Sequence, residues 1–191
     1  MIAILGISHQ SAPVSVRELY AFDEQEKLTF ANQIKTRLQI EGIVILSTCN
    51  RTEIYFNSRL EKESEVYLLI TDELKKFKNI VNDNLQHFYF CTQGMAVKQL
   101  FKVSSGLESL VLGEEQILGQ VKDAFRNAQT RKLTDCIISR LFIKAIEAGK
   151  RVRTETNLNK GAASVSYATV ELCYEIFPEF QNHKRSHAAC R

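Results

Sequence analysis

The spacing of the hydrophobic residues changes near residue 93, and this change limits the folds that the chain can adopt. Before it, short β-branched and aromatic runs predict strands at 2–7, 43–47, 53–57 and 85–91, with helices at 23–39 and 64–77. After it, three-and-four spacing predicts helices at 95–103, 114–130, 134–153 and 162–176. The order βαββαβ indicates an α+β fold, a ferredoxin-like sandwich followed by a helical segment that ends in a long helix.

Composition excludes several classes of protein. With 45% hydrophobic residues among 191, the chain can bury a core. The net charge of +3 comes from the last eleven residues, which contain three basic side chains and no acid. Overall charge therefore gives no evidence of nucleic-acid binding. No apolar run is long enough to span a bilayer, and residues 1–5 lack a basic leader. We therefore expect a cytoplasmic protein.

The five cysteines have irregular spacing and include no Cys-x-x-Cys pair, which argues against a disulfide framework or a structural zinc site. Cys91, Cys136 and Cys173 lie among apolar residues, and we expect them in the core. The remaining candidate ligands, His183, His187 and Cys190, lie in a basic, aperiodic tail, so we predict no metal site.

Cys49 differs from the other cysteines because it lies in a polar turn between two apolar, β-branched runs. Hydroxyl, amide and guanidinium groups flank it in Ser47-Thr48-Cys49-Asn50-Arg51-Thr52. Arg51 can stabilise a thiolate, which is the nucleophilic form of cysteine. The alternative is that Cys49 is a small turn residue without a chemical role. His9, after the first predicted strand, is either a hydrogen-bonding loop residue or part of a site.

A second polar segment follows Gly106 and leads into the helix predicted at 114–130. One interpretation is that its polar groups cap the helix, because Glu114 at a helix start suits the helix dipole. The other is that they bind a ligand.

Four blocks of sequence together resemble the N-terminal part of the glutamyl-tRNA reductase family. They are residues 6–14, 47–55, 106–122, and 150–156 with 163–168. The resemblance implies a catalytic domain at 1–155, the start of a connecting helix at 156–178 and a non-homologous basic tail at 179–191. We interpret the chain as truncated, because the family's NADPH-binding and dimerisation domains would follow. The family forms homodimers mainly through a C-terminal helical domain, so without it we predict a monomer, which gel filtration would test.

The resemblance also implies a reaction. Cys49 attacks glutamyl-tRNA to give a thioester, and NADPH reduces the thioester to glutamate-1-semialdehyde for tetrapyrrole (porphyrin) synthesis. Glutamate-1-semialdehyde aminomutase is a further partner that the resemblance suggests. Arg51 would bind the γ-carboxylate of the substrate bidentately, and Glu114 its α-ammonium. The substrate-binding residues it implies are Thr48, Asn50, Arg51, Ser109, Glu114, Glu115, Gln116 and Gln120.

One position departs from the family. Gln99 stands where the family has a histidine that assists catalysis, and glutamine cannot accept and return a proton near neutral pH. Two hypotheses follow: an enzyme that forms the thioester at Cys49, or a catalytically impaired remnant that binds glutamyl-tRNA without turnover. The candidate tRNA-binding residues are Lys144, Lys150, Arg151, Arg153 and Lys160. The alternative for them is a solvated helix face.

Overall fold

The structure is a computed structural model that describes residues 1–81, 84–110, 113–156 and 176. Its first half forms a four-stranded sheet from β1 (Ile2–Ser8), β2 (Ile40–Ser47), β3 (Arg51–Ser58) and β4 (Tyr89–Thr92). The strand order is β2-β3-β1-β4, and each neighbouring pair is antiparallel. A split βαββαβ arrangement gives this order, so the predicted ferredoxin-like sandwich is confirmed.

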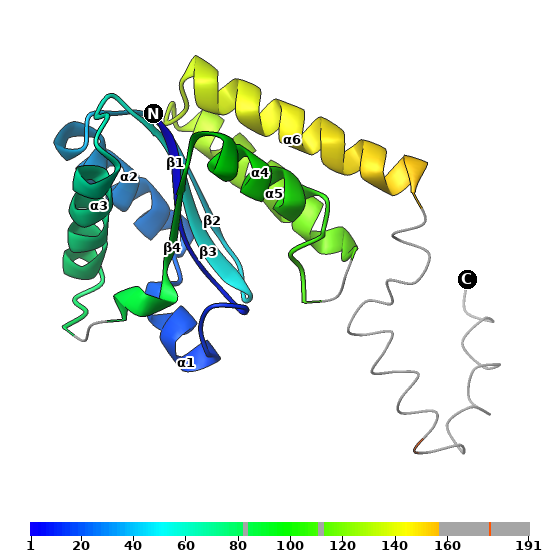
Figure 1. Cartoon of the computed structure of the whole chain (residues 1–191), viewed down its shortest axis with the longest axis horizontal. Coiled ribbons are helices and arrows are strands. Elements are labelled where there is room, and N and C mark those ends of the chain that lie inside the picture. Colours follow the sequence, from blue (N-terminus) through cyan, green and yellow to red (C-terminus); the bar gives the residue numbers. More distant parts are fainter. Residues whose placement is uncertain (82–83, 111–112, 157–175, 177–191) are drawn as a thin grey trace.

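Two helices, α2 (Glu24–Arg37) and α3 (Glu63–Phe77), cover one face of the sheet (Figure 1). The first begins where the sequence predicts, because Asp23 and Glu26 form a reciprocal capping box with hydrogen bonds of 2.7 and 2.9 Å. Between the two helices the aromatic rings of Phe22, Phe30 and Phe77 lie within 5.9 Å of one another, centroid to centroid.

The helical segment covers the opposite face, so the sheet becomes the middle of three layers (Figure 1). It consists of α4 (Gln93–Ser104), α5 (Glu115–Thr130) and α6 (Cys136–Glu155). Helix α4 contacts β1, while α5 and α6 contact β2. Both faces of the sheet are therefore covered, which explains why β3 is buried along its whole length and why residues 43–46 are apolar without alternation.

The exposed edge of β2 is closed where the two halves of the fold meet. The backbone N–H of Ile43 donates to the carbonyl of Leu133, which precedes α6 (2.9 Å). A bond of this kind satisfies an edge strand that would otherwise be open to pairing with another chain.

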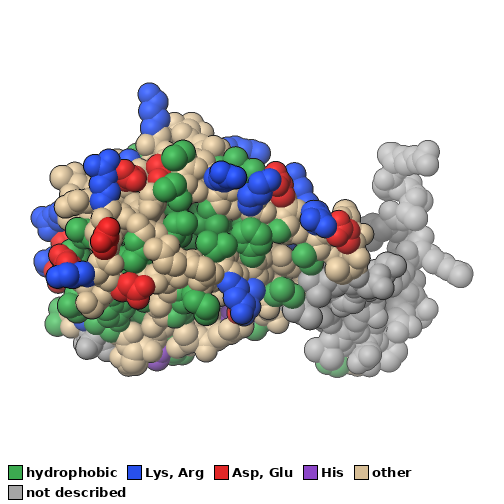
Figure 2. All heavy atoms as spheres, turned by 45° about the horizontal axis from the view of Figure 1, so that its top comes forward, with side chains coloured by type: hydrophobic (Ala, Val, Ile, Leu, Met, Phe, Trp, Pro, Cys, Tyr) green, Lys and Arg blue, Asp and Glu red, His purple; other side chains and the backbone are tan. Residues whose placement is uncertain are grey.

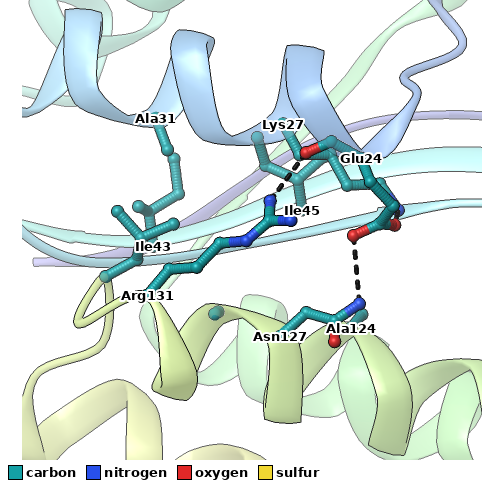
Figure 3. A pocket seen from close by; sticks show the side chains of 10 residues that line it. Glu24, Lys27, Ala31, Ile43, Ile45, Ala124, Asn127 and Arg131 are labelled. Carbon is teal, nitrogen blue, oxygen red and sulfur yellow. Dashed lines mark hydrogen bonds and ion pairs between the residues drawn. The ribbon is translucent and has the colours of Figure 1, made fainter.

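Beside this edge, α2 and α5 enclose a hollow of about 310 Å³ (Figure 3). The Glu24 carboxylate accepts hydrogen bonds from Asn127 (3.0 Å) and Lys27 (2.7 Å). Arg131 donates to the Glu24 carbonyl oxygen (2.6 Å). These polar groups bind one another across the hollow, so we assign them a structural role in joining the helical segment to the sandwich.

Three details differ from the sequence predictions. The strand predicted at 85–91 is a short 3-10 turn, η2 (Leu85–His87), followed by β4, because only residues 89–92 pair with β1. A short helix α1 (Val14–Arg17) and a 3-10 turn η1 (Glu18–Tyr20) follow β1 and were not predicted. Cys136 is exposed rather than in the core, since Asp135 caps α6 (2.8 Å to the Ile138 N–H) and places Cys136 on the outer side of the first turn.

Part of the prediction falls outside the described residues. This applies to the helix at 162–176 apart from residue 176, to most of the connecting segment at 156–178, to the tail at 179–191, and to Cys173 and Lys160. Among the helices that the structure describes, none combines the length and apolarity needed to cross a membrane.

Candidate active site

Cys49 lies at the apex of the hairpin that joins β2 to β3. The Thr48 N–H donates to the Arg51 carbonyl (2.8 Å), and the Thr48 hydroxyl accepts from the N–H groups of Asn50 and Arg51 (3.2 Å each). Outside the turn, an Arg17 guanidinium nitrogen donates to the Cys49 carbonyl. The backbone of the turn is therefore held from both sides, while the Cys49 thiol is free and exposed. A rigid backbone under an accessible thiol suits a nucleophile.

The second polar segment is held beside this hairpin by bonds to its backbone. Gly106 and Gly113 both have positive φ (76° and 78°), and the Gly113 N–H donates to the Gly106 carbonyl (3.0 Å). A Cβ on Gly106 would lie 3.1 Å from the Gly113 Cα, so close approach of the two backbones also favours glycine. Arg51 donates to the Glu108 carbonyl, and Arg153 donates to the Glu114 carbonyl (2.9 Å).

A hollow of about 290 Å³ lies between these two segments. Its walls include eight of the ten predicted site residues: Thr48, Cys49, Asn50, Arg51, Ser109, Glu114, Gln116 and Gln120, together with Ile117. The Glu114 side chain makes no capping hydrogen bond although Glu114 is the N-cap of α5. This favours the ligand-binding interpretation of Glu114 over the capping one. The side chain of Glu115 lies outside the described part of the structure.

The tenth predicted residue, Gln99, is absent from the walls of this hollow and contacts a buried carboxylate instead. Its amide nitrogen donates to Glu53 (3.1 Å). Glu53 is 0% exposed and also accepts from Arg51 (3.1 Å), the Tyr55 hydroxyl (2.6 Å) and the Tyr89 hydroxyl. We call this set the Glu53 cluster. Four donors on one carboxylate satisfy a charge that would otherwise be costly to bury.

The electrostatics of the Glu53 cluster are those of a neutralised ion pair. Burial, and then the charge of Glu53, raise the pKa of Tyr55 and Tyr89, so both phenols remain hydrogen-bond donors. Burial, the largest single influence, would lower the pKa of Arg51, but the electrostatic influence of Glu53, Tyr89 and Tyr55 and the hydrogen bond to Glu53 together raise it. Arg51 therefore stays charged, and Glu53 offsets part of its positive potential at Cys49.

Arg51 is 2% exposed and links the Glu53 cluster to the hollow. One terminal nitrogen binds Glu53 and the other binds the Glu108 carbonyl, while its Nε is buried without a hydrogen-bond partner. These two bonds use two of the five guanidinium N–H groups, which leaves the Nε–H and one N–H on each terminal nitrogen.

Sequence reasoning left the role of His9 open, and it missed Glu53. The backbone N–H of His9 donates to the Asn50 carbonyl (2.9 Å), and the Nδ1 of the His9 ring is buried without a hydrogen-bond partner. Burial lowers the pKa of His9, and the nearby charges of Arg51 and Arg17 lower it further, whereas Glu108 acts in the opposite direction. His9 is therefore a neutral imidazole against the hairpin at pH 7. For Glu53, a signal existed: Arg51, Glu53 and Tyr55 alternate along one face of β3.

The candidate tRNA-binding residues on α6 are largely engaged by acidic groups or backbone. Lys144 binds Glu147 (2.7 Å) and Arg151 binds Glu155 (2.9 Å). Figure 2 brings the side of the molecule that carries α6 toward the viewer, and it shows basic and acidic side chains interspersed there. Arg153 binds the Glu114 carbonyl, as described above. The tRNA contact of this helix stays a prediction.

Among the described residues, no group of three His, Cys, Asp or Glu side chains converges as metal ligands would. The fold and the site together define the class of protein: a ferredoxin-like domain that presents an exposed cysteine, on a hairpin, to a polar loop at the start of a helix. Residues 5–156 match the model of the family described as glutamyl-tRNAGlu reductase, N-terminal domain. The chain belongs to this family.

Similar proteins carry the name of this family. The chain is 42% identical over 173 residues to the glutamyl-tRNA reductase of Pelotomaculum thermopropionicum. The aligned region covers 90% of this chain and 38% of that protein. It is 39% identical over 184 residues to that of Carboxydothermus hydrogenoformans, with coverage of 96% and 40%. The solved structure of glutamyl-tRNA reductase from Methanopyrus kandleri matches with a TM-score of 0.72 and 32% identity, over 91% of this chain and 39% of that one. The chain thus spans about two fifths of the length of these relatives.

Proposed function

We propose that this chain is the acyl-accepting part of a glutamyl-tRNA reductase, in which Cys49 attacks the ester that joins glutamate to tRNA. The observation that carries the proposal is the hollow where the exposed Cys49 thiol meets polar side chains of the 109–120 segment. The relatives' names supply the substrate class and the overall reaction. The domain boundary at residue 155 is part of the same proposal.

In the proposed step, the Cys49 thiolate sulfur forms a bond to the carbonyl carbon of the glutamyl ester. The bond between that carbon and the terminal ribose oxygen breaks, and the ribose oxygen leaves with the proton that the thiol gave up. The products are a glutamyl thioester and free tRNA. Sulfur suits this reaction because a thiolate is strongly nucleophilic and a thioester is reduced more readily than an oxygen ester.

The hollow supplies groups for both charged ends of the glutamyl group. Glu114 can bind the α-ammonium, and the hydroxyl of Ser109 can bind either end. Two of the five N–H groups of Arg51 are engaged, so the γ-carboxylate would take a remaining Arg51 N–H and further donors. The amides of Gln116 and Gln120, which line the same hollow, are the donors we assign to it.

The second half of the reaction needs a hydride donor, which by family resemblance is NADPH. The sequence contains no G-x-G-x-x-G segment of the kind that cradles dinucleotide phosphates. The described residues therefore do not fit the cofactor, and we assign no step of the reduction to them. The homodimer and the aminomutase partner stay predictions, because only the family resemblance suggests them.

The competing function is recognition of glutamyl-tRNA without turnover. The observation in its favour is Gln99, which cannot carry a proton where the family has a histidine. Under this hypothesis the hollow would still bind the glutamyl group, but Cys49 would not be acylated.

Mass spectrometry of the intact chain separates the two functions. The chain is mixed with glutamyl-tRNA in the absence of NADPH, beside Cys49→Ser and Cys136→Ser. Cys136 is the matched control because it is also a free, exposed cysteine. We expect a glutamyl adduct on the wild type and on Cys136→Ser, but none on Cys49→Ser. Retained tRNA binding without any adduct would establish the recognition module instead.

A further inference from the structure

A second hollow, of about 620 Å³, lies against the same hairpin turn. The two hollows share the wall formed by residues 48–51 and have different opposite walls. The first is closed by the 109–120 segment, and the second by Val14, Arg17, Glu18 and Ala21 of α1, η1 and the residue that follows. Cys49 therefore stands on the wall common to both hollows.

Hydrogen bonds fix the segments that form the second hollow. Arg17 spans it, donating from one terminal nitrogen to the Cys49 carbonyl and from Nε to the Ala12 carbonyl (3.3 Å). The backbone below it is fixed as well, because the N–H of Phe22 donates to the hydroxyl of Ser47 (2.9 Å). The position of this wall relative to the thiol is thus set by hydrogen bonds from two segments of the chain.

The geometry of an acyl transfer requires two binding regions around the attacking atom. The ester carbon carries the amino-acid part on one side and the leaving alcohol on the other, and both stay attached to it while sulfur adds. The first hollow is lined by polar side chains and is the smaller of the two. It suits an amino acid, so the alcohol must extend in another direction from Cys49.

We propose that the second hollow holds the leaving group of the ester, the terminal nucleoside of the RNA, during attack by Cys49. Val14 is 55% exposed and, with Ala21, offers an apolar surface to one face of a base. Arg17 adds a cation beside it, and Glu18 can accept from ribose hydroxyls. This inference rests on the proposed acylation of Cys49 and assigns the second of its two binding regions.

The test compares two acyl donors. One is glutamyl-tRNA, and the other is a small thioester of the glutamate α-carboxyl with 2-mercaptoethanesulfonate, which carries no nucleoside. Val14→Asp places a charge on the apolar wall at the first position of α1, where an acid suits the helix dipole and the fold. Leu19→Asp is the matched control, because Leu19 is 47% exposed on the same segment but does not line the hollow.

We expect Val14→Asp to slow acylation of Cys49 by glutamyl-tRNA about tenfold or more, the factor that loss of one base contact usually produces. Acylation by the small thioester should be unchanged, and Leu19→Asp should react like the wild type with both donors. A second variant, Ala21→Leu, narrows the hollow without adding charge and should show the same selectivity for the tRNA donor.

Three results would overturn the inference: equal slowing with both donors, no slowing with either, or equal slowing of the tRNA reaction by Leu19→Asp. Failure of the proposed function itself looks different, because glutamyl-tRNA would then not acylate the wild type at all, although the small thioester can still exchange with exposed thiols such as Cys49 and Cys136.

Discussion

Replacing Glu53 by glutamine tests whether the Glu53 cluster holds Arg51 in place. Glu53 is 0% and Arg51 2% exposed, so the substitution leaves a buried guanidinium without its charge partner. Removing one partner of such a pair typically costs about 3–5 kcal/mol. A total stability of about 5–15 kcal/mol for a domain would leave the variant folded but much weakened.

The assay is equilibrium unfolding in urea, followed by far-UV circular dichroism at pH 7. Glu73→Gln is the matched control: Glu73 is 6% exposed, but its partner Arg37 is 61% exposed and would be solvated after the change. We expect a loss below about 1 kcal/mol for this control. A loss at Glu53 no larger than the loss at Glu73 would refute the reasoning, since Arg51 would then not depend on Glu53.

Three further predictions concern single contacts. Because the pKa of His9 is lowered in the folded protein, His9 takes up a proton more readily in the unfolded chain as the pH falls below about 6.5. The free energy of unfolding should therefore decrease as the pH drops through this range. In His9→Gln the urea midpoint should decrease less between pH 7 and 5.5. Gly6→Ala places a Cβ 2.4 Å from the Tyr89 ring and should cost about 1.5–3 kcal/mol if Tyr89 loses its bond to Glu53, whereas an unchanged urea midpoint would contradict this. Asp135→Ala removes the N-cap of α6 and should lower stability by about 1–2 kcal/mol, which thermal unfolding would detect.

The sequence predicted the elements whose signals are local. The capping box at Asp23, the polar turn at Cys49 and the periodicity of α5 are each visible within a short stretch of residues. The Glu53 cluster could be predicted only in part: Arg51, Glu53 and Tyr55 share a face of β3, but the place of Tyr89 depends on strand register. Gly6 pairs with Glu53 on one side and with Tyr89 on the other, so the Tyr89 ring crosses β1 where no side chain blocks it. Register between strands so far apart in sequence is fixed by the whole fold.

The residues of the candidate site also differ in whether a local sequence signal predicted them. The residues that line the hollow were predicted through two sequence blocks, and the structure brings eight of them together. His9 carried no comparable signal, since a single histidine after a strand has many ordinary explanations. Its place against Asn50 follows from the antiparallel pairing of Ser8 with Arg51, which sets the end of β1 beside the hairpin turn.

The place of Gln99 changes how strongly it argues against catalysis. Its amide donates to Glu53, and Glu53 in turn binds Arg51, so Gln99 reaches the hollow through two intervening side chains. A residue in this position acts on the orientation of Arg51, and a donor amide serves that purpose without carrying a proton. We therefore expect Gln99→Leu, which removes the donor, to slow acylation of Cys49, and Gln99→His, which can restore it, to react like the wild type at neutral pH. If Gln99→His were instead about 10²-fold faster, proton transfer at this position would be limiting and the impaired-remnant hypothesis would gain its strongest support.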